Sequence, residues 1–123
     1  MINFAHLGLS VSDLAKSKKF YIQALAALGL KLVKEGERYA RFGLDNGRTM
    51  FYIYIEKRAT SSGPVHIAFE AETRSQVDEF YKAGLAAGGR DNGAPGIREN
   101  YSPNYYAAFL FDPDGNNVEA VCR

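Results

Sequence analysis

The sequence predicts an α+β fold made of two βαβββ modules, whose curved antiparallel sheets form a cup. The first observation is an internal repeat, because residue n matches residue n+60 along a whole strand and helix. The matching pairs are His6 with His66, Phe20-Tyr21 with Phe80-Tyr81, Leu25-Ala26-Ala27 with Leu85-Ala86-Ala87, and Gly29 with Gly89. The second observation is that each copy has an alternating stretch before a helical pattern, and the third is the turn residues between the later strands. We therefore expect a single domain of module 1 (residues 1–58) and module 2 (residues 65–123), joined near Ala59 to Pro64.

Module 1 has clear local signals for each of its elements. The stretch from Ile2 to Val11 alternates as a strand does, and Ser12 or Asp13 can cap the helix that follows. Apolar residues then recur at helical spacing until Gly29 ends the helix. Three further strands are expected near Lys31 to Lys34, Tyr39 to Phe42 and Thr49 to Glu56.

Module 2 has the same order of elements. In its helix, Thr73 and Gln76 have the spacing of a capping box, and Gly84 indicates close packing because glycine costs about 1 kcal/mol relative to alanine there. The segment from Gly88 to Asn104 is rich in Gly, Asn and Pro, so we expect a loop over the cup. The strands of this module are expected at Val65 to Ala71, near Arg98, at Tyr105 to Phe111 and at Asn117 to Cys122.

The composition excludes several classes of function. Fifteen basic and fourteen acidic residues give a net charge of +1, so no broad positive field is available to bind nucleic acid. The single cysteine, Cys122, excludes an internal disulfide and fits a reducing, cytoplasmic setting. The sequence has no signal-peptide pattern and no run of eighteen apolar residues, so neither export nor a membrane location is expected.

Strand alternation places three potential metal ligands on one face. The bulky faces of the outer strands must pack on the helices, which leaves His6, His66 and Glu119 on the concave face. Two neutral imidazoles and one carboxylate suit one divalent metal ion (Fe, Mn, Ni or Zn), with positions left for water and substrate. A histidine or glutamate in a strand is ordinarily a structural or solvated residue. The metal interpretation is favoured because the two histidines of the chain occupy equivalent positions in the repeat.

The surroundings of this set predict a small-molecule pocket. Phe51, Ile53 and Val121 are expected to form apolar walls that exclude water and strengthen the field of the ion. Arg98 is expected to contact substrate from the Gly- and Asn-rich segment.

Four segments resemble the vicinal-oxygen-chelate superfamily, which includes glyoxalase I, extradiol dioxygenases, fosfomycin-resistance enzymes, methylmalonyl-CoA epimerase and bleomycin-binding proteins. They are His6-Leu-Gly-Leu-Ser-Val-Ser-Asp13, Ser17 with Phe20-Tyr21, His66-Ile-Ala-Phe69, and Asp112-Pro-Asp-Gly-Asn-Asn-Val-Glu119. The resemblance covers nearly the whole chain. It implies a glyoxalase/bleomycin-resistance/dioxygenase-like fold, metal ligands at His6, His66 and Glu119, and a homodimer.

The resemblance also bears on the reaction. Glyoxalase I and the epimerase use a fourth ligand on the last strand of the first module, where alignment of Gly47 with Gly115 puts Phe51. Extradiol dioxygenases use a further histidine as acid or base, and here Tyr101, Tyr105 or Tyr106 would have to replace it.

Three functions remain open on this basis. The first is a metal-dependent enzyme, either a glyoxalase-family lyase or isomerase or an extradiol-type dioxygenase, that binds neighbouring oxygens of a small substrate and stabilises the resulting anion. The second is a metal-free drug or metabolite binding protein of the bleomycin-resistance type. The third is a structural or regulatory dimer without turnover.

Overall fold

The structure, a computed structural model, describes residues 2–56 and 64–123 of the chain and contains two modules of equal element order. Module 1 consists of β1 (Leu7–Ser10), α1 (Leu14–Ala26), β2 (Lys31–Glu35), β3 (Tyr39–Gly43) and β4 (Thr49–Tyr54). Module 2 consists of β5 (His66–Glu70), α2 (Arg74–Ala86), β6 (Arg90–Ile97), β7 (Tyr106–Phe111) and β8 (Asn117–Cys122). The expected duplication is thus confirmed. The joint expected near Ala59 to Pro64 lies, except for Pro64, outside the described residues.

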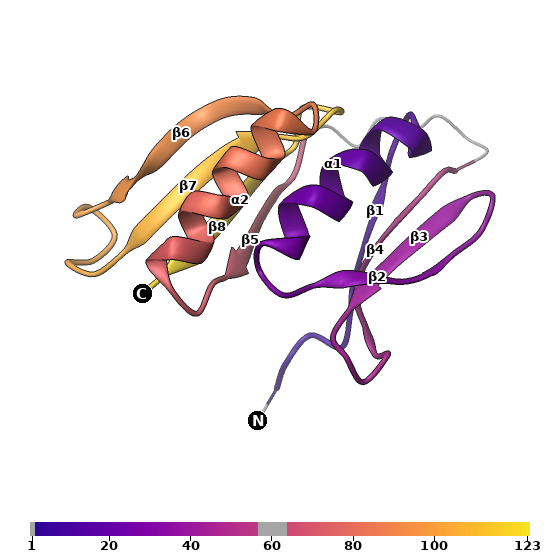
Figure 1. Cartoon of the computed structure of the whole chain (residues 1–123), viewed down its shortest axis with the longest axis horizontal. Coiled ribbons are helices and arrows are strands. Elements are labelled where there is room, and N and C mark those ends of the chain that lie inside the picture. The colour runs from indigo at the N-terminus through magenta and orange to yellow at the C-terminus, as the bar shows by residue number, and fades with distance from the viewer. Residues whose placement is uncertain (1, 57–63) are drawn as a thin grey trace.

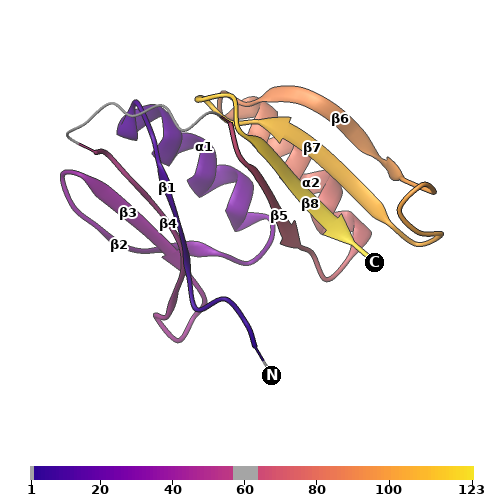
Figure 2. The same cartoon turned by 180° about the vertical axis from the view of Figure 1, so that it is seen from behind.

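Each module has one four-stranded sheet, and the sheets are open. Their strand orders are β1-β4-β3-β2 and β5-β8-β7-β6, so the first and last strands of each module are neighbours. Both sheets are mixed rather than wholly antiparallel as expected, because β1 runs parallel to β4 and β5 runs parallel to β8, while the other pairs are antiparallel. The sheets lie side by side with β1 and β5 at their adjacent edges, and both helices cover the same side (Figures 1 and 2).

The helices begin at the residues that the sequence indicates. The Asp13 side chain accepts a hydrogen bond of 3.1 Å from the backbone N–H of Lys16, which satisfies a donor that the first turn leaves unpaired. Thr73 accepts from Gln76 N–H at 3.1 Å, as in a capping box, and the Gln76 side chain accepts at 2.7 Å from the N–H of Glu72, one residue before the cap. Both expected N-termini are therefore confirmed.

One hydrophobic core joins the two modules. Helices α1 and α2 pack against each other, and a single cluster of buried apolar residues includes members of both sheets. Gly84 in α2 makes this approach possible, because a Cβ there would collide with Leu110 of β7 and crowd Phe20 of α1. The close packing expected at Gly84 is thus confirmed.

A buried polar contact also ties the modules together. The turn between β7 and β8 carries Asp112, which is 1% exposed and accepts a hydrogen bond of 2.6 Å from the Tyr21 hydroxyl of α1. The same carboxylate accepts from the backbone N–H groups of Asp114 and Asn116, which holds the turn in shape. The Ser12 hydroxyl in turn donates to Asp114. The Asp112-Pro-Asp-Gly motif is therefore a turn that docks on the start of α1.

The segment from Gly88 to Asn104 differs from expectation. Instead of one long loop, residues Arg90–Ile97 form β6, and the loop is confined to the residues between β6 and β7. Glycine and proline are rare in strands, but β6 is an edge strand whose pairing with β7 shifts register twice. An edge strand with such irregularities accommodates Gly93, Pro95 and Gly96.

In the described ranges, neither helix combines the length and the apolar character that crossing a bilayer would require.

Candidate metal and substrate site

His66 and Glu119 converge on the face of the second sheet opposite the helices. His66 begins β5, and Glu119 of β8 lies beside Ala68 in the parallel register. The imidazole Nε2 of His66 is 2.8 Å from Oε1 of Glu119. The Glu119 side chain is 2% exposed and that of His66 is 53% exposed. The carboxylate is therefore buried, while the imidazole lies at the protein surface.

Tyr105 completes the hydrogen bonding of this carboxylate. Its hydroxyl donates to Oε2 of Glu119, so each carboxylate oxygen has one partner. Burial, followed by the hydrogen bond to Glu119 and the charge of that carboxylate, raises the pKa of Tyr105 to about 12. The hydroxyl therefore keeps its proton at neutral pH and remains a donor.

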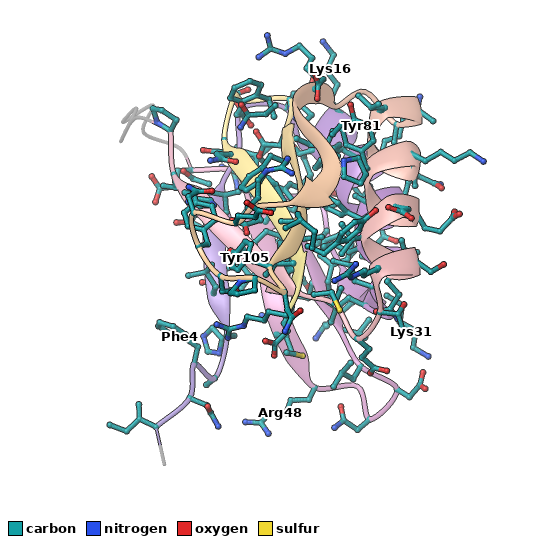
Figure 3. The ribbon with its side chains drawn as sticks, turned by 90° about the vertical axis from the view of Figure 1, so that its left-hand side faces the viewer. Phe4, Lys16, Lys31, Arg48, Tyr81 and Tyr105 are labelled. Atoms are coloured by element: carbon teal, nitrogen blue, oxygen red, sulfur yellow. The ribbon has the colours of Figure 1, made fainter. Side chains whose placement is uncertain are left out.

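The three tyrosines that the sequence singled out have different surroundings. Tyr105 contacts Glu119, and the ring of Tyr101 lies 4.9 Å from the ring of Tyr105, measured between centroids. Tyr106 points to the helix side, where its hydroxyl donates to Asp78 of α2 at 2.6 Å. Figure 3 shows Tyr105 over the strands, away from α2.

His6 is not brought to His66 and Glu119 within one chain. Over residues 2–56 and 64–123, no group of three or more His, Cys, Asp or Glu side chains is arranged to hold a metal ion. The ring of His6 instead lies 5.8 Å from that of Tyr52 in β4. One chain therefore presents a His-Glu pair in module 2 and a His-Tyr pair in module 1.

Tyr52 is the module 1 counterpart of Glu119. The parallel register pairs Gly8 with Tyr52 in the first sheet and Ala68 with Glu119 in the second, and Gly8 and Ala68 are equivalent in the repeat. Alignment of the sequence had put Phe51 at this position. The difference is one residue, because Met50 is an extra residue in β4 where its pairing with β3 shifts register.

The same shift explains where the expected apolar walls lie. Phe51 and Ile53 are at most 1% exposed and belong to the core beneath the helices, with the Phe51 ring 5.1 Å from that of Tyr21. They do not line the concave face as expected, since a one-residue offset exchanges the two faces of a strand. Tyr52 and Tyr54 occupy that face instead. Val121, two residues after Glu119, shares the face of the carboxylate and is 5% exposed.

The space left by Gly8 is occupied by the side chain of Tyr52. A Cβ at this position would overlap the ring of Tyr52, so the absence of a side chain lets the ring lie across β1. The small residue two positions after His6 therefore accommodates Tyr52.

A pocket of about 350 Å³ opens at β6, β7 and β8, and His66 and Glu119 are not among its lining residues. Its lining includes the expected Arg98, the ring of Phe109 and the amide side chains of Asn92, Asn100 and Asn117. The rings of Phe109 and His66 are 6.3 Å apart, which places the pocket next to the imidazole. The sequence did not indicate Phe109, Asn92 or Asn117. For Asn117 the signal was its place two residues before Glu119 on the same face of the strand.

The comparisons with known proteins agree with this architecture. Residues 3–120 match the family model of the Glyoxalase/Bleomycin resistance protein/Dioxygenase superfamily. The uncharacterized protein YqjT of Bacillus subtilis (strain 168) is 31% identical over 130 residues, which cover 94% of this chain and 95% of that protein. A glyoxalase/bleomycin resistance protein from Albidiferax ferrireducens T118 has a similar structure, with a TM-score of 0.80, 31% identity and 98% coverage of both chains. A glyoxalase I mutant from Zea mays has a TM-score of 0.71 and 27% identity over 95% of this chain and 45% of that one. The chain belongs to the glyoxalase/bleomycin resistance protein/dioxygenase superfamily.

Proposed function

We propose that the chain is a divalent-metal-dependent enzyme that acts on a small substrate with two neighbouring oxygens. We further propose that its site is completed across a homodimer, where the partner subunit's His6 joins His66 and Glu119. The observation that carries the proposal is the buried Glu119 carboxylate, whose two oxygens are held by His66 and Tyr105 on the open face of a sheet.

The donor set fits such an ion. An imidazole nitrogen and a carboxylate oxygen that lie 2.8 Å apart, as in His66 and Glu119, are ligand atoms suited to iron, manganese, nickel or zinc. The Tyr105 hydroxyl holds the second oxygen of Glu119, as hydrogen bonds from outside the ligand set orient ligands in other metal sites. A buried carboxylate that is held by an imidazole and a phenol is also costly unless a positive charge balances it.

Two observations support closure by a second copy of the chain. First, His6 and His66 are equivalent in the repeat but separated in one chain, and a two-fold axis would bring module 1 of one copy to module 2 of the other. Second, the segment around His6 exposes large apolar side chains, with Ile2 98% exposed, Phe4 92% and Leu7 40%. Figure 3 shows Phe4 on a segment that extends away from the sheets. Clustered exposed apolar residues are typical of a surface that a partner covers.

The protein groups have separate tasks in this scheme. A metal ion held by His66, Glu119 and the partner subunit's His6 would stabilise negative charge on the substrate oxygens. Tyr105 keeps Glu119 oriented, while Phe109 and Val121 exclude water beside it. The superfamily includes glyoxalase and dioxygenase enzymes, and one similar structure is a glyoxalase I. Module 1 has Tyr52 at the position where glyoxalase I has an acidic fourth ligand. We therefore assign to this chain the stabilisation of an anion, which is the step that these enzymes share, and no more specific reaction.

Metal analysis tests the proposal. Wild-type protein, His66→Ala and Glu119→Gln are purified identically, and metal content per chain is measured with thermal midpoints in the presence and absence of added ions. We expect bound metal and a metal-dependent rise in midpoint for wild type alone. Equal metal content in all three proteins would overturn the proposal. A wild-type protein that takes up no ion would instead favour the metal-free binding protein.

A further inference from the structure

The pocket beside His66 contains an arginine that the fold holds in place. The guanidinium carbon of Arg98 lies 5.3 Å from the centroid of the Phe109 ring, and its Nη2 donates a hydrogen bond of 2.8 Å to the backbone carbonyl of Ala94. Stacking on an aromatic ring and one backbone acceptor fix the plane of the group.

The glycines of β6 make space for this guanidinium. A Cβ at Gly93 would lie 3.2 Å from Nη2 of Arg98, and one at Gly96 would lie 3.1 Å from Nη1. Both distances are tighter than ordinary packing, so a larger residue at either position would press on the group. The backbone of Arg98 is fixed as well, because its N–H donates to the carbonyl of Tyr105 at 2.7 Å.

Within residues 2–56 and 64–123, the remaining donors of Arg98 have no acidic partner. Among the residues that line the pocket, Arg98 alone is charged, and across the described part of the chain no carboxylate forms an ion pair with it. An arginine has five N–H donors in a planar fork, of which Ala94 accepts from one nitrogen. The other N–H groups of the guanidinium are thus available to donate hydrogen bonds to a ligand with two anionic oxygens.

The pocket relates this fork directly to the His66-Glu119 pair. The Phe109 ring stacks with Arg98 and lies 6.3 Å from the His66 ring, so one aromatic side chain separates the cation from the imidazole. The neighbouring polar lining is uncharged, with the Asn92 amide donating to Asn117 at 3.1 Å. His66 and Glu119 do not line the pocket, so a molecule that Arg98 binds there has to extend past the Phe109 ring to reach them.

We infer that the substrate carries an anionic oxygen group, a carboxylate or a phosphate, which Arg98 binds while the rest of the molecule faces His66 and Glu119. This inference rests on the proposed function for the reacting end of the substrate. The anion site itself is a property of module 2 and exists with or without metal.

The test is a titration of ¹⁵N-labelled full-length protein with three probes at constant ionic strength. Succinate represents a carboxylate, inorganic phosphate represents a phosphate, and succinamide is the uncharged analogue of succinate. The backbone amides of Gly93 and Gly96 report on the pocket. We expect saturable shifts with at least one of the two anions and none with succinamide, and the more effective anion identifies the group.

Three variants make the test specific. Arg98→Gln is expected to weaken anion binding roughly tenfold or more, and Arg98→Lys to weaken it less, because a charge remains without the fork. Arg90→Gln is the matched control, since Arg90 stacks over Phe111 at the same 5.3 Å but does not line the pocket. This control should bind the anion as wild type does. Equal binding by Arg98→Gln and wild type, equal loss in Arg90→Gln, or equal shifts with succinamide would each overturn the inference.

Metal content measured on the same samples separates the two proposals. A protein that takes up no metal but binds succinate or phosphate through Arg98 contradicts the proposed function and supports the anion site. A metal-binding protein whose anion affinity is unchanged by Arg98→Gln contradicts the anion site alone.

Discussion

The hydroxyl of Tyr21 donates a hydrogen bond of 2.6 Å to the carboxylate of Asp112, which lies 91 residues later in the chain. Both side chains are buried, and the bond links the first helix of module 1 to the turn that precedes the Glu119 strand. The position of Glu119 therefore depends on contacts between the modules as well as on its own sheet.

Removal of this hydroxyl should destabilise the fold. We expect Tyr21→Phe to lower the free energy of unfolding by about 1–3 kcal/mol, because Asp112 would keep a buried carboxylate without that donor. Chemical denaturation followed by circular dichroism measures the change. Tyr81→Phe is the control, since Tyr81 donates to Asp91 at an exposed site, and its effect should be clearly smaller. Equal effects of the two substitutions would show that burial of the Tyr21 pair does not matter.

The same pair predicts a loss of stability at alkaline pH. Burial, followed by the charge of Asp112 and the hydrogen bond to it, raises the pKa of Tyr21 well above its usual value of 10.0. The unfolded chain therefore loses this proton at lower pH than the folded chain, so the contribution is complete below about pH 10 and falls as the pH rises through the folded pKa. Unfolding free energies measured from pH 8 to 11 should fall less steeply in Tyr21→Phe than in wild type. Parallel curves would contradict this assignment.

Tyr105 should influence metal binding without being a ligand. Tyr105→Phe removes the donor to Glu119, and loss of a group that orients a ligand lowers metal affinity by about 10- to 100-fold. Competition with a chromophoric chelator gives the affinity for zinc. Tyr101→Phe is the matched control, because the Tyr101 ring lies 4.9 Å from that of Tyr105, and it should retain wild-type affinity. Unchanged affinity in Tyr105→Phe would mean that Glu119 needs no second partner.

Gly43 marks the register shift that determines which residues of β4 face the site. A Cβ there would collide with the backbone carbonyl of Arg48, which cannot rotate away. We expect Gly43→Ala to cost about 1–3 kcal/mol of stability, as other overpacked positions do. In the control Gly36→Ala, the three atoms nearest to the added Cβ belong to the side chain of Tyr39 rather than to backbone, so the cost should be lower. Similar denaturation midpoints for both variants would contradict the tight packing at Gly43.

The sequence was sufficient for the modules and their helices. The 60-residue repeat predicted two equal element orders, and the cap signals at Asp13 and Thr73 are confirmed. Alternation also predicted that His66 and Glu119 share a face, because both lie in short, regularly paired strands.

The errors arose where a strand is irregular. Phe51 and Ile53 were assigned to the wrong face of β4 because one extra residue near Met50 cannot be recognised from alternation alone. β6 was interpreted as a loop because its glycines and proline disfavour strands, although an edge position tolerates them. Alternation predicts which face of its sheet a residue occupies, but it does not predict how the two sheets are placed relative to each other. The separation of His6 in module 1 from His66 in module 2 was therefore not predictable.

Subunit complementation tests the central claim most directly. His6→Ala and His66→Ala are each purified, and neither should bind metal alone. When the two are mixed and allowed to exchange subunits, each mixed dimer should contain one intact site, made of His66 and Glu119 of one chain and His6 of the other. Random exchange should then restore about a quarter of the wild-type sites, measured as bound metal per chain. Metal binding by wild type together with none in the exchanged mixture would contradict a site shared between subunits.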